Sequence, residues 1–152
     1  MGLDTSHDCW HGAYSAFLRW RSKVAEVVGL PPLRLMEGFF ERGSYTDPLR
    51  READFLKSLN CLDSEDSLYA GLPIRWDALK PDPLYTLLNH SDYDGEIVHL
   101  NCKPLADRLR EILPLMPDGD GGGHIGDWRK KTQAFIDGLM LAHERGEAVG
   151  FY

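Results

Sequence analysis

The chain has 152 residues, of which 43% are hydrophobic and 27% are charged, a composition typical of a globular protein. This length predicts a single globular helical domain over residues 1–152 and argues against two independent cores. The formal charge of −7 disfavours non-specific nucleic-acid binding, which depends on basic side chains that neutralise phosphates.

The first predicted helix covers residues 9–28, where apolar side chains recur at helical spacing. Gly29 ends it, and Pro31 prevents its continuation. The next segment, residues 33–46, is either a strand or irregular, because its glycines argue against one continuous element.

Two further helices are predicted where an aspartate precedes a proline, since the carboxylate can cap the helix and proline suits its first turn. The first pair, Asp47-Pro48, begins a helix over residues 48–60. The second pair, Asp82-Pro83, begins a short helix that ends near residue 90. The connection between them is predicted as a loop with a helical turn, in which a short strand over residues 74–76 is possible.

The last two predicted helices cover residues 103–113 and 127–146, separated by a connection rich in proline and glycine. The pattern therefore predicts a mainly α fold, a single-domain irregular helical bundle that leaves room for a small β hairpin. Basic clusters at residues 19–23 and 129–131 lie inside predicted helices, and we interpret them as solvated helix faces.

The sequence also limits the cellular setting. No apolar run approaches the ~18 residues that suggest a membrane span, and the first residues do not resemble a signal peptide, so no membrane association is expected. Three cysteines without paired spacing, Cys9, Cys61 and Cys102, favour reduced thiols. We expect a cytoplasmic protein.

The first candidate site is the segment LLNHSDYDGEI, residues 87–97, which follows a predicted helix C-terminus. Carbonyl groups at a helix end carry partial negative charge, so Asp92, Asp94 and Glu96 concentrate like charge there. A metal ion, protonated His90, or an incoming arginine or lysine could offset it. The competing interpretation, which we favour slightly, is an ordinary turn.

Two metal motifs partly match this segment. Counted from His90, the aspartates and Gly95 occupy the third, fifth and sixth positions of an EF-hand calcium loop, but the twelfth position is Asn101 rather than glutamate. The same residues spell H-x-D-x-D-G, which resembles the first metal-binding motif of the Asp-His-His phosphoesterases. That resemblance covers six residues, and the further motifs of those enzymes are absent from the sequence.

The second candidate site is DTSHDCWH, residues 4–11. If a helix already includes His7, then His7 and His11 stand four residues apart on one face, where two imidazoles can share a metal. Capping of the helix by Thr5, Ser6 or Asp8 is the alternative that we favour, and it would leave His7 outside the helix.

A site that joins both segments is the strongest form of an enzyme hypothesis. The two N-terminal histidines would supply nitrogen ligands, and the later segment would supply the rest; the candidate metal ligands are His7, His11, His90, Asp92 and Asp94. Such a set suits a divalent metal: zinc, manganese or iron, or calcium by analogy with the calcium loop. An open coordination position on the metal could activate water for hydrolysis. Cys9 is a further candidate, as ligand or nucleophile.

A glycine-rich segment, GDGGGHIGDW, precedes the last predicted helix. Its glycines fit G-x-G-x-x-G, and the helix N-terminus with Lys130 and Lys131 nearby could hold an anion. No strand is predicted before it, so a mobile connection is the interpretation that we favour.

Three segments, GLDTSHDCWHGAYSAFLRWR, LLNHSDYDGEI and WRKKTQAFIDGL, carry a resemblance over most of the chain. In these three segments the chain resembles a group of small proteins encoded by bacteriophages, prophages and bacteria. The resemblance implies a cytoplasmic bacterial or phage setting and no particular activity. Our leading hypothesis is therefore an accessory protein that binds a partner protein, and the alternative is a metal-dependent hydrolase.

Overall fold

The computed structural model describes residues 2–39, 72–79, 81–91 and 94–152, and these ranges are mainly helical. The helices are α1 (Tyr14–Val27), α4 (Tyr85–Leu88), α5 (His99–Ile112) and α6 (Trp128–Arg145). The strands are β1 (Gly2–Asp4), β2 (His11–Ala13), β3 (Gly95–Ile97) and β4 (Val149–Phe151). Short 3-10 turns are η1 (Ser6–Asp8), η2 (Leu33–Leu35), η4 (Trp76–Leu79) and η5 (Leu113–Leu115). The helix predicted over residues 48–60 lies outside the described ranges.

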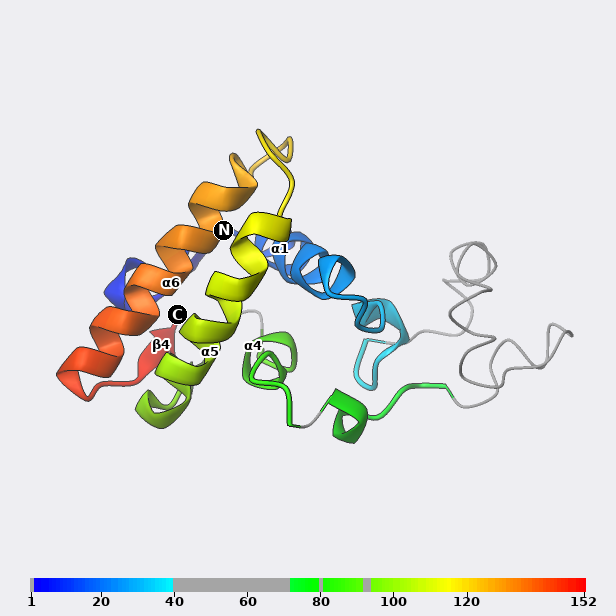
Figure 1. Cartoon of the computed structure of the whole chain (residues 1–152), viewed down its shortest axis with the longest axis horizontal. Helices are drawn as coiled ribbons and strands as arrows, with labels where there is room; N and C mark the ends of the chain where they lie inside the picture. The colour runs from blue at the N-terminus through cyan, green and yellow to red at the C-terminus, as the bar shows by residue number, and fades with distance from the viewer. Residues whose placement is uncertain (1, 40–71, 80, 92–93) are drawn as a thin grey trace, which may run out of the picture.

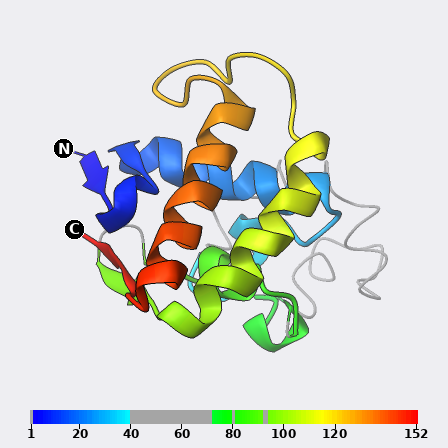
Figure 2. The ribbon, with the colours of Figure 1, turned by 60° about the vertical axis from the view of Figure 1, so that its left-hand side comes forward.

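Helices α5 and α6 lie side by side and antiparallel, and α1 crosses behind them (Figures 1 and 2). Each contributes an apolar face to a common core, in which the rings of Trp20 and Phe135 lie 4.9 Å apart. Leu105 and Leu109 of α5 are fully buried in the same core. Burial of each such side chain contributes about 1.5–3 kcal/mol to stability.

The four strands form two antiparallel ribbons, β1 with β2 and β3 with β4. The ribbons meet where the backbone groups of Asp4 and Tyr152 exchange two hydrogen bonds of 2.9 and 3.0 Å, beside a bridge between Thr5 and Phe151. The two ends of the described chain are thereby joined, as Figure 2 shows at its left. The sequence allowed for one small hairpin, whereas the described residues form two two-stranded ribbons.

Two predicted helix starts were wrong. The first helix begins at Tyr14 rather than at residue 9, because residues 11–13 pair with β1 and do not begin the helix. Helix α5 begins at His99, four residues before the predicted start, and contains Pro104 in its second turn. The last helix agrees with its prediction: the side chain of Asp127 accepts a hydrogen bond from the backbone of Lys130 at its start.

The segment before α4 contains a helical turn, as predicted, and no strand over residues 74–76. Ile74 makes a single parallel bridge to Met36, and residues 76–79 form the turn η4. The Asp82 carboxylate then accepts a 2.9 Å hydrogen bond from the backbone of Leu84. It does not cap the helix as predicted, because the N-cap residue of α4 is Leu84, which has no side-chain cap hydrogen bond. In the described ranges, no helix is long and apolar enough to cross a membrane.

Candidate functional site

The end of α4, where the first candidate segment begins, is closed by a buried cation from α1. Nη1 of Arg21 donates to the carbonyl oxygens of Leu87, Leu88 and His90 at 3.2, 3.3 and 2.7 Å. The guanidinium also lies 4.7 Å from the centre of the Phe17 ring. Burial lowers the pKa of Arg21 to about 10, which keeps it charged at neutral pH. An incoming arginine was one of the three predicted ways to offset the negative charge at this helix end. The interpretation of residues 19–23 as a solvated helix face was wrong for Arg21, which is buried.

His90 packs against the C-terminal strand. Its ring stacks on Phe151, with centroids 3.9 Å apart, and Nδ1 lies 2.7 Å from the carbonyl oxygen of Ser91. Gly95 covers the ring closely, since a Cβ on that residue would lie 3.4 Å from Cε1 and Nε2 of the imidazole. The φ angle of Gly95 is 101°, which also favours glycine. His90 therefore helps to pack the turn onto β4.

His7 belongs to a chain of hydrogen bonds that joins η1 to the end of the protein. The backbone N–H of Gly150 donates to Oγ of Ser6 at 2.9 Å, and this hydroxyl lies 2.8 Å from Nδ1 of His7. Nε2 of His7 lies 2.5 Å from Oε2 of Glu147. The simplest proton arrangement has Ser6 donating to Nδ1 and Nε2–H donating to the carboxylate. We call this chain the terminal clasp.

The terminal clasp contains the residue types of a Ser-His-Glu triad. In the chymotrypsin-type arrangement, however, serine bonds Nε2 and the carboxylate bonds Nδ1, the reverse of the contacts of His7. The Ser6 oxygen also accepts the bond from Gly150, which draws electron density away from a nucleophile. The contacts of His7 with Glu147 and of Ser6 with Gly150 connect η1 to the segment around β4, and the Ser6–His7 contact joins the two within η1, so the arrangement is complete as a structural link.

The backbone at the clasp is unusual. His7 and Asp8 have φ angles of 60° and 55°, values that non-glycine residues adopt at a cost of about 1–2 kcal/mol each. Gly138 of α6 lies directly against this turn, since a Cβ there would come within 2.6 Å of the carbonyl oxygen of His7. Helix α6 and the clasp together hold the turn in this conformation.

The other predicted ligands lie apart from one another. His11 begins β2, its side chain is exposed, and Nδ1 contacts the Asp4 carboxylate across the ribbon. His7 and His11 are therefore not on one helical face, and the N-terminal residues do not cap α1 either, because Ala13 holds that position. Asp94 is exposed just before β3, and Asp92 lies outside the described residues.

The two candidate segments nevertheless meet, because both pack on β4. His90 stacks on Phe151, and Thr5, next to Ser6, pairs with the same strand residue. Among the described residues, no group of three or more His, Cys, Asp or Glu side chains is placed to hold a metal. The full set with Asp92 remains a prediction. Sequence reasoning missed Glu147 and Gly150 because no motif links them to the N-terminus.

Cys9, the further candidate ligand or nucleophile, is buried and unreactive in this structure. It is 1% exposed and packs against Gly138, whose added Cβ would come within 2.4 Å of the sulfur. Burial raises the pKa of its thiol from 9.0 to about 12, so almost no thiolate exists at neutral pH. Cys102 is likewise buried, with a raised pKa, and both are free thiols.

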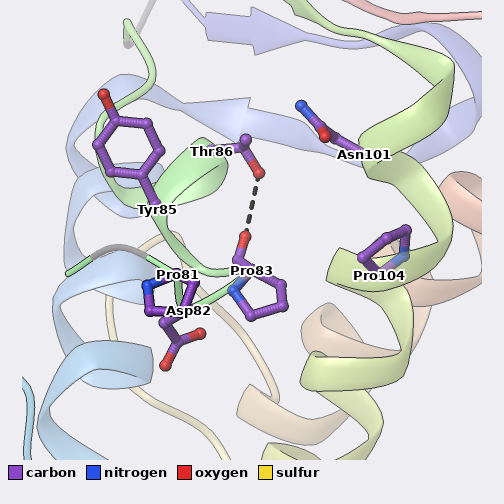
Figure 3. Close-up of a pocket in the computed structure, with 7 residues that line it drawn as sticks. All are labelled: Pro81, Asp82, Pro83, Tyr85, Thr86, Asn101 and Pro104. Carbon is purple, nitrogen blue, oxygen red and sulfur yellow. Dashed lines mark hydrogen bonds between the residues drawn. The ribbon is translucent and has the colours of Figure 1, made fainter.

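A groove lies between α5 and the segment that leads into α4. Its lining, which we call the proline groove, consists of Pro81, Asp82, Pro83, Tyr85, Thr86, Asn101 and Pro104, around a volume of about 260 Å³. Figure 3 shows Asn101 and Pro104 of α5 on one side and the other five residues opposite. The Thr86 hydroxyl donates to the Pro83 carbonyl oxygen at 3.1 Å, which fixes that wall.

The proline groove continues along α5 into an acidic depression. This depression shares Pro81, Asp82, Pro83 and Pro104 with the groove and adds Asp107, Arg108 and Glu111. Its lining carries three carboxylates and one guanidinium, a net formal charge of −2. At the opposite end, Leu100 is 74% exposed, one helical turn before Pro104 and therefore on the same side of α5. The surface thus has an apolar end and an acidic end.

No protein-family model matches the chain, and no match was found among curated proteins or among solved structures. Only the surface and the buried contacts of this chain therefore bear on its function.

Proposed function

We propose that this chain is a small cytoplasmic accessory protein, one irregular helical bundle that binds a segment of a partner protein in the proline groove. The observation that supports this is the position of Leu100, which is 74% exposed beside a groove lined by three prolines and a tyrosine. Large exposed apolar side chains next to a concave surface are typical of binding sites. The resemblance to phage and prophage proteins adds a bacterial or phage setting to the proposal.

The walls of the proline groove are rigid, which suits recognition. Prolines have a fixed φ angle, so Pro81, Pro83 and Pro104 lose little conformational freedom when a ligand covers them. Tyr85 gives a large contact area with few rotatable bonds. The Asp82 carboxylate is held by Arg108, with Nη2 and Oδ2 3.3 Å apart. A partner therefore meets a surface that is already in its binding conformation.

The two ends of the surface specify the partner segment. The centre of the pair Asn101 and Pro104 lies about 10 Å along α5 from the centre of Asp107 and Glu111, at 1.5 Å per residue. An extended chain covers this distance with about three residues. We propose a segment with an apolar side chain in the groove and a lysine or arginine about three residues away, above Asp107 and Glu111. Asp107 is paired with Lys103 and Arg110, and Glu111 with Arg108; these ion pairs are partly exposed, so they can rearrange readily.

The contacts of the candidate histidines are consistent with this proposal. His7, His11 and His90 each have a separate partner, Glu147, Asp4 and Phe151 respectively. The alternative, a metal-dependent hydrolase with Asp92 and Asp94 among its ligands, stays a prediction. Elemental analysis of protein purified without a metal column tests it, with the double variant His90→Ala, Asp92→Ala as control.

A peptide-display selection tests the proposal directly. A library of random twelve-residue peptides is selected on the immobilised full-length chain, and the affinities of enriched peptides are then measured for wild type and for Leu100→Asp. We expect enrichment of an apolar residue followed about three residues later by lysine or arginine. We also expect Leu100→Asp to weaken these peptides at least about tenfold, because it places a charge at the apolar end.

Leu115 provides the matched control, since it is also an exposed leucine, at 55%, but lies fifteen residues after Leu100, in η5. Leu115→Asp is expected to leave the affinities within about twofold. Glu111→Arg should weaken binding of the same peptides, and exchange of the basic peptide residue for glutamate should restore part of it. Peptides that bind Leu100→Asp as tightly as wild type, or a selection without enrichment, would overturn the proposal.

A further inference from the structure

The indole N–H of Trp10 is a buried donor without an acceptor. Trp10 is 2% exposed and packs against Phe17 and Trp20, with ring centroids 5.2 and 5.4 Å away. Among the described residues, Nε1 of Trp10 has no hydrogen-bond partner. Trp20 shows the usual arrangement, because its Nε1 donates to Oγ1 of Thr132 at 3.0 Å. A buried donor that lacks an acceptor is costly, and such groups are rare in native structures.

A cation lies beside this donor. Nζ of Lys131 is 4.6 Å from the centre of the Trp10 ring and donates to the backbone carbonyl oxygen of His11 at 2.9 Å. Burial lowers the pKa of Lys131, and none of the described residues supplies a carboxylate to pair with it. In a protein of net charge −7, an ammonium group next to an unmatched N–H is an unusual concentration of positive potential.

Gly12 is the residue that both donors face. A Cβ on Gly12 would lie 3.5 Å from Nε1 of Trp10 and 3.9 Å from Nζ of Lys131. The φ angle of Gly12 is 153°, a value that favours glycine in this strand. Both groups therefore lie on the same side of β2, where Gly12 places no side chain between them.

We propose that Trp10 Nε1–H and Lys131 Nζ bind an oxyanion beside Gly12, either a carboxylate or a phosphate group. One ligand oxygen would accept the indole N–H, and the ammonium would neutralise the negative charge. Because the indole N–H is covered in the free protein, the flexible side chain of Lys131 moves aside as the ligand enters. This site lies on β2 and α6, away from the proline groove, so it stands independently of the function proposed above.

The indole N–H signals in a ¹H–¹⁵N NMR spectrum give a specific readout. The chain has four tryptophans, and the Trp10 signal is assigned with Trp10→Phe. Acetate, inorganic phosphate and chloride are titrated separately at equal ionic strength. We expect acetate, phosphate or both to shift the Trp10 signal saturably, while the Trp20 signal, which already has its acceptor, stays in place. Saturation by acetate alone assigns a carboxylate, and saturation by phosphate alone assigns a phosphate group.

Lys131→Met removes the charge and keeps an apolar stem, so it is expected to weaken binding at least about tenfold. Lys130→Met is the matched control, because Lys130 is an exposed neighbour on α6 outside this contact. It should leave the affinity within about twofold. The proposal is overturned if neither anion shifts the Trp10 signal, if chloride shifts it equally, or if Lys131→Met binds as wild type does. Neither lysine variant alters a core residue, and triple-resonance assignment of the wild type identifies the Trp10 signal if Trp10→Phe does not fold.

Discussion

Nη1 of Arg21 lies 2.7 Å from the carbonyl oxygen of His90, so a fully buried side chain of α1 closes the end of α4. Leu87 and Leu88 are the last residues of α4, and Nη1 of Arg21 donates to both of their carbonyl oxygens and to that of His90 just beyond the helix. This contact connects the first helix of the chain to the turn that carries His90.

Arg21→Met should therefore lower the free energy of unfolding by about 3 kcal/mol, because it leaves buried carbonyl groups unpaired. Arg21→Lys should recover only part of this loss, since lysine ends one bond short of the position of Nη1 and lacks the planar group that lies over the Phe17 ring. Urea denaturation measures both variants. Arg19→Met, on the exposed face of the same helix and 5.8 Å from Trp128, is the control and should change stability by less than about 0.5 kcal/mol. Equal effects at both positions would contradict the assigned role of Arg21.

The end of α4 also shows what the sequence could predict. The aspartates and glutamate after a helix C-terminus were sufficient to predict a positive partner, because the electrostatic argument is local. The identity of that partner was not predictable, since Arg21 lies 69 residues earlier and sits in a helix whose other basic residues are solvated. Long-range pairs of this kind depend on tertiary packing, which one sequence does not reveal.

The terminal clasp was not predicted from the sequence, for a related reason. Strands of three residues, such as β2 and β4, are too short to show an alternating pattern, and the helix predicted over residues 9–28 was wrongly extended over β2. The strongly periodic helices α1 and α6 were predicted well in their central parts. Of the proline groove, the sequence predicted only that one helix begins near Asp82-Pro83 and that another lies where α5 is found.

Gly138 should not tolerate a side chain. A Cβ at this position would lie 2.4 Å from Sγ of Cys9 and 2.6 Å from the carbonyl oxygen of His7, and the second contact involves backbone. We expect Gly138→Ala to reduce the free energy of unfolding by about 3 kcal/mol, despite the better helix propensity of alanine. Chemical denaturation followed by circular dichroism measures the loss.

The double variant Gly138→Ala, Cys9→Ala separates the two contacts. Removal of the sulfur should restore part of the free energy of unfolding lost in Gly138→Ala. The remaining loss should persist, because the new Cβ still clashes with the carbonyl oxygen of His7. Simple addition of the two single effects would show that the sulfur contact does not limit the packing of α6 on η1.

The buried thiol of Cys9 predicts a loss of stability at alkaline pH. Its folded pKa of about 12 is above the unfolded value of 9.0, so between these values the folded protein binds more protons than the unfolded protein. The contribution is fully present below pH 9.0 and is lost as the pH rises toward 12. In this window the free energy of unfolding should fall by up to about 1.4 kcal/mol per pH unit from this group.

Comparison with Cys9→Ala isolates this effect from other groups that titrate at high pH. The variant should be less stable than wild type at pH 8, and its stability should fall less steeply between pH 9 and 11. Equal slopes would mean that the thiol ionises normally in the folded protein. Peptide-resolved alkylation gives a second measurement, in which Cys9 of the native protein should react with iodoacetamide about a thousandfold more slowly than in the unfolded chain.

Asp8 offers a test of the strained backbone at the clasp. Its φ angle is 55° and its side chain is exposed, so glycine can adopt the same conformation without the steric cost and without loss of a buried contact. We expect Asp8→Gly to raise the free energy of unfolding by up to about 1 kcal/mol, measured by thermal denaturation. Asp4→Gly, in extended β1, is the matched control and should destabilise instead, because it adds flexibility and removes the contact with His11. A destabilised Asp8→Gly would show that the Asp8 side chain contributes more to the turn than its backbone conformation costs.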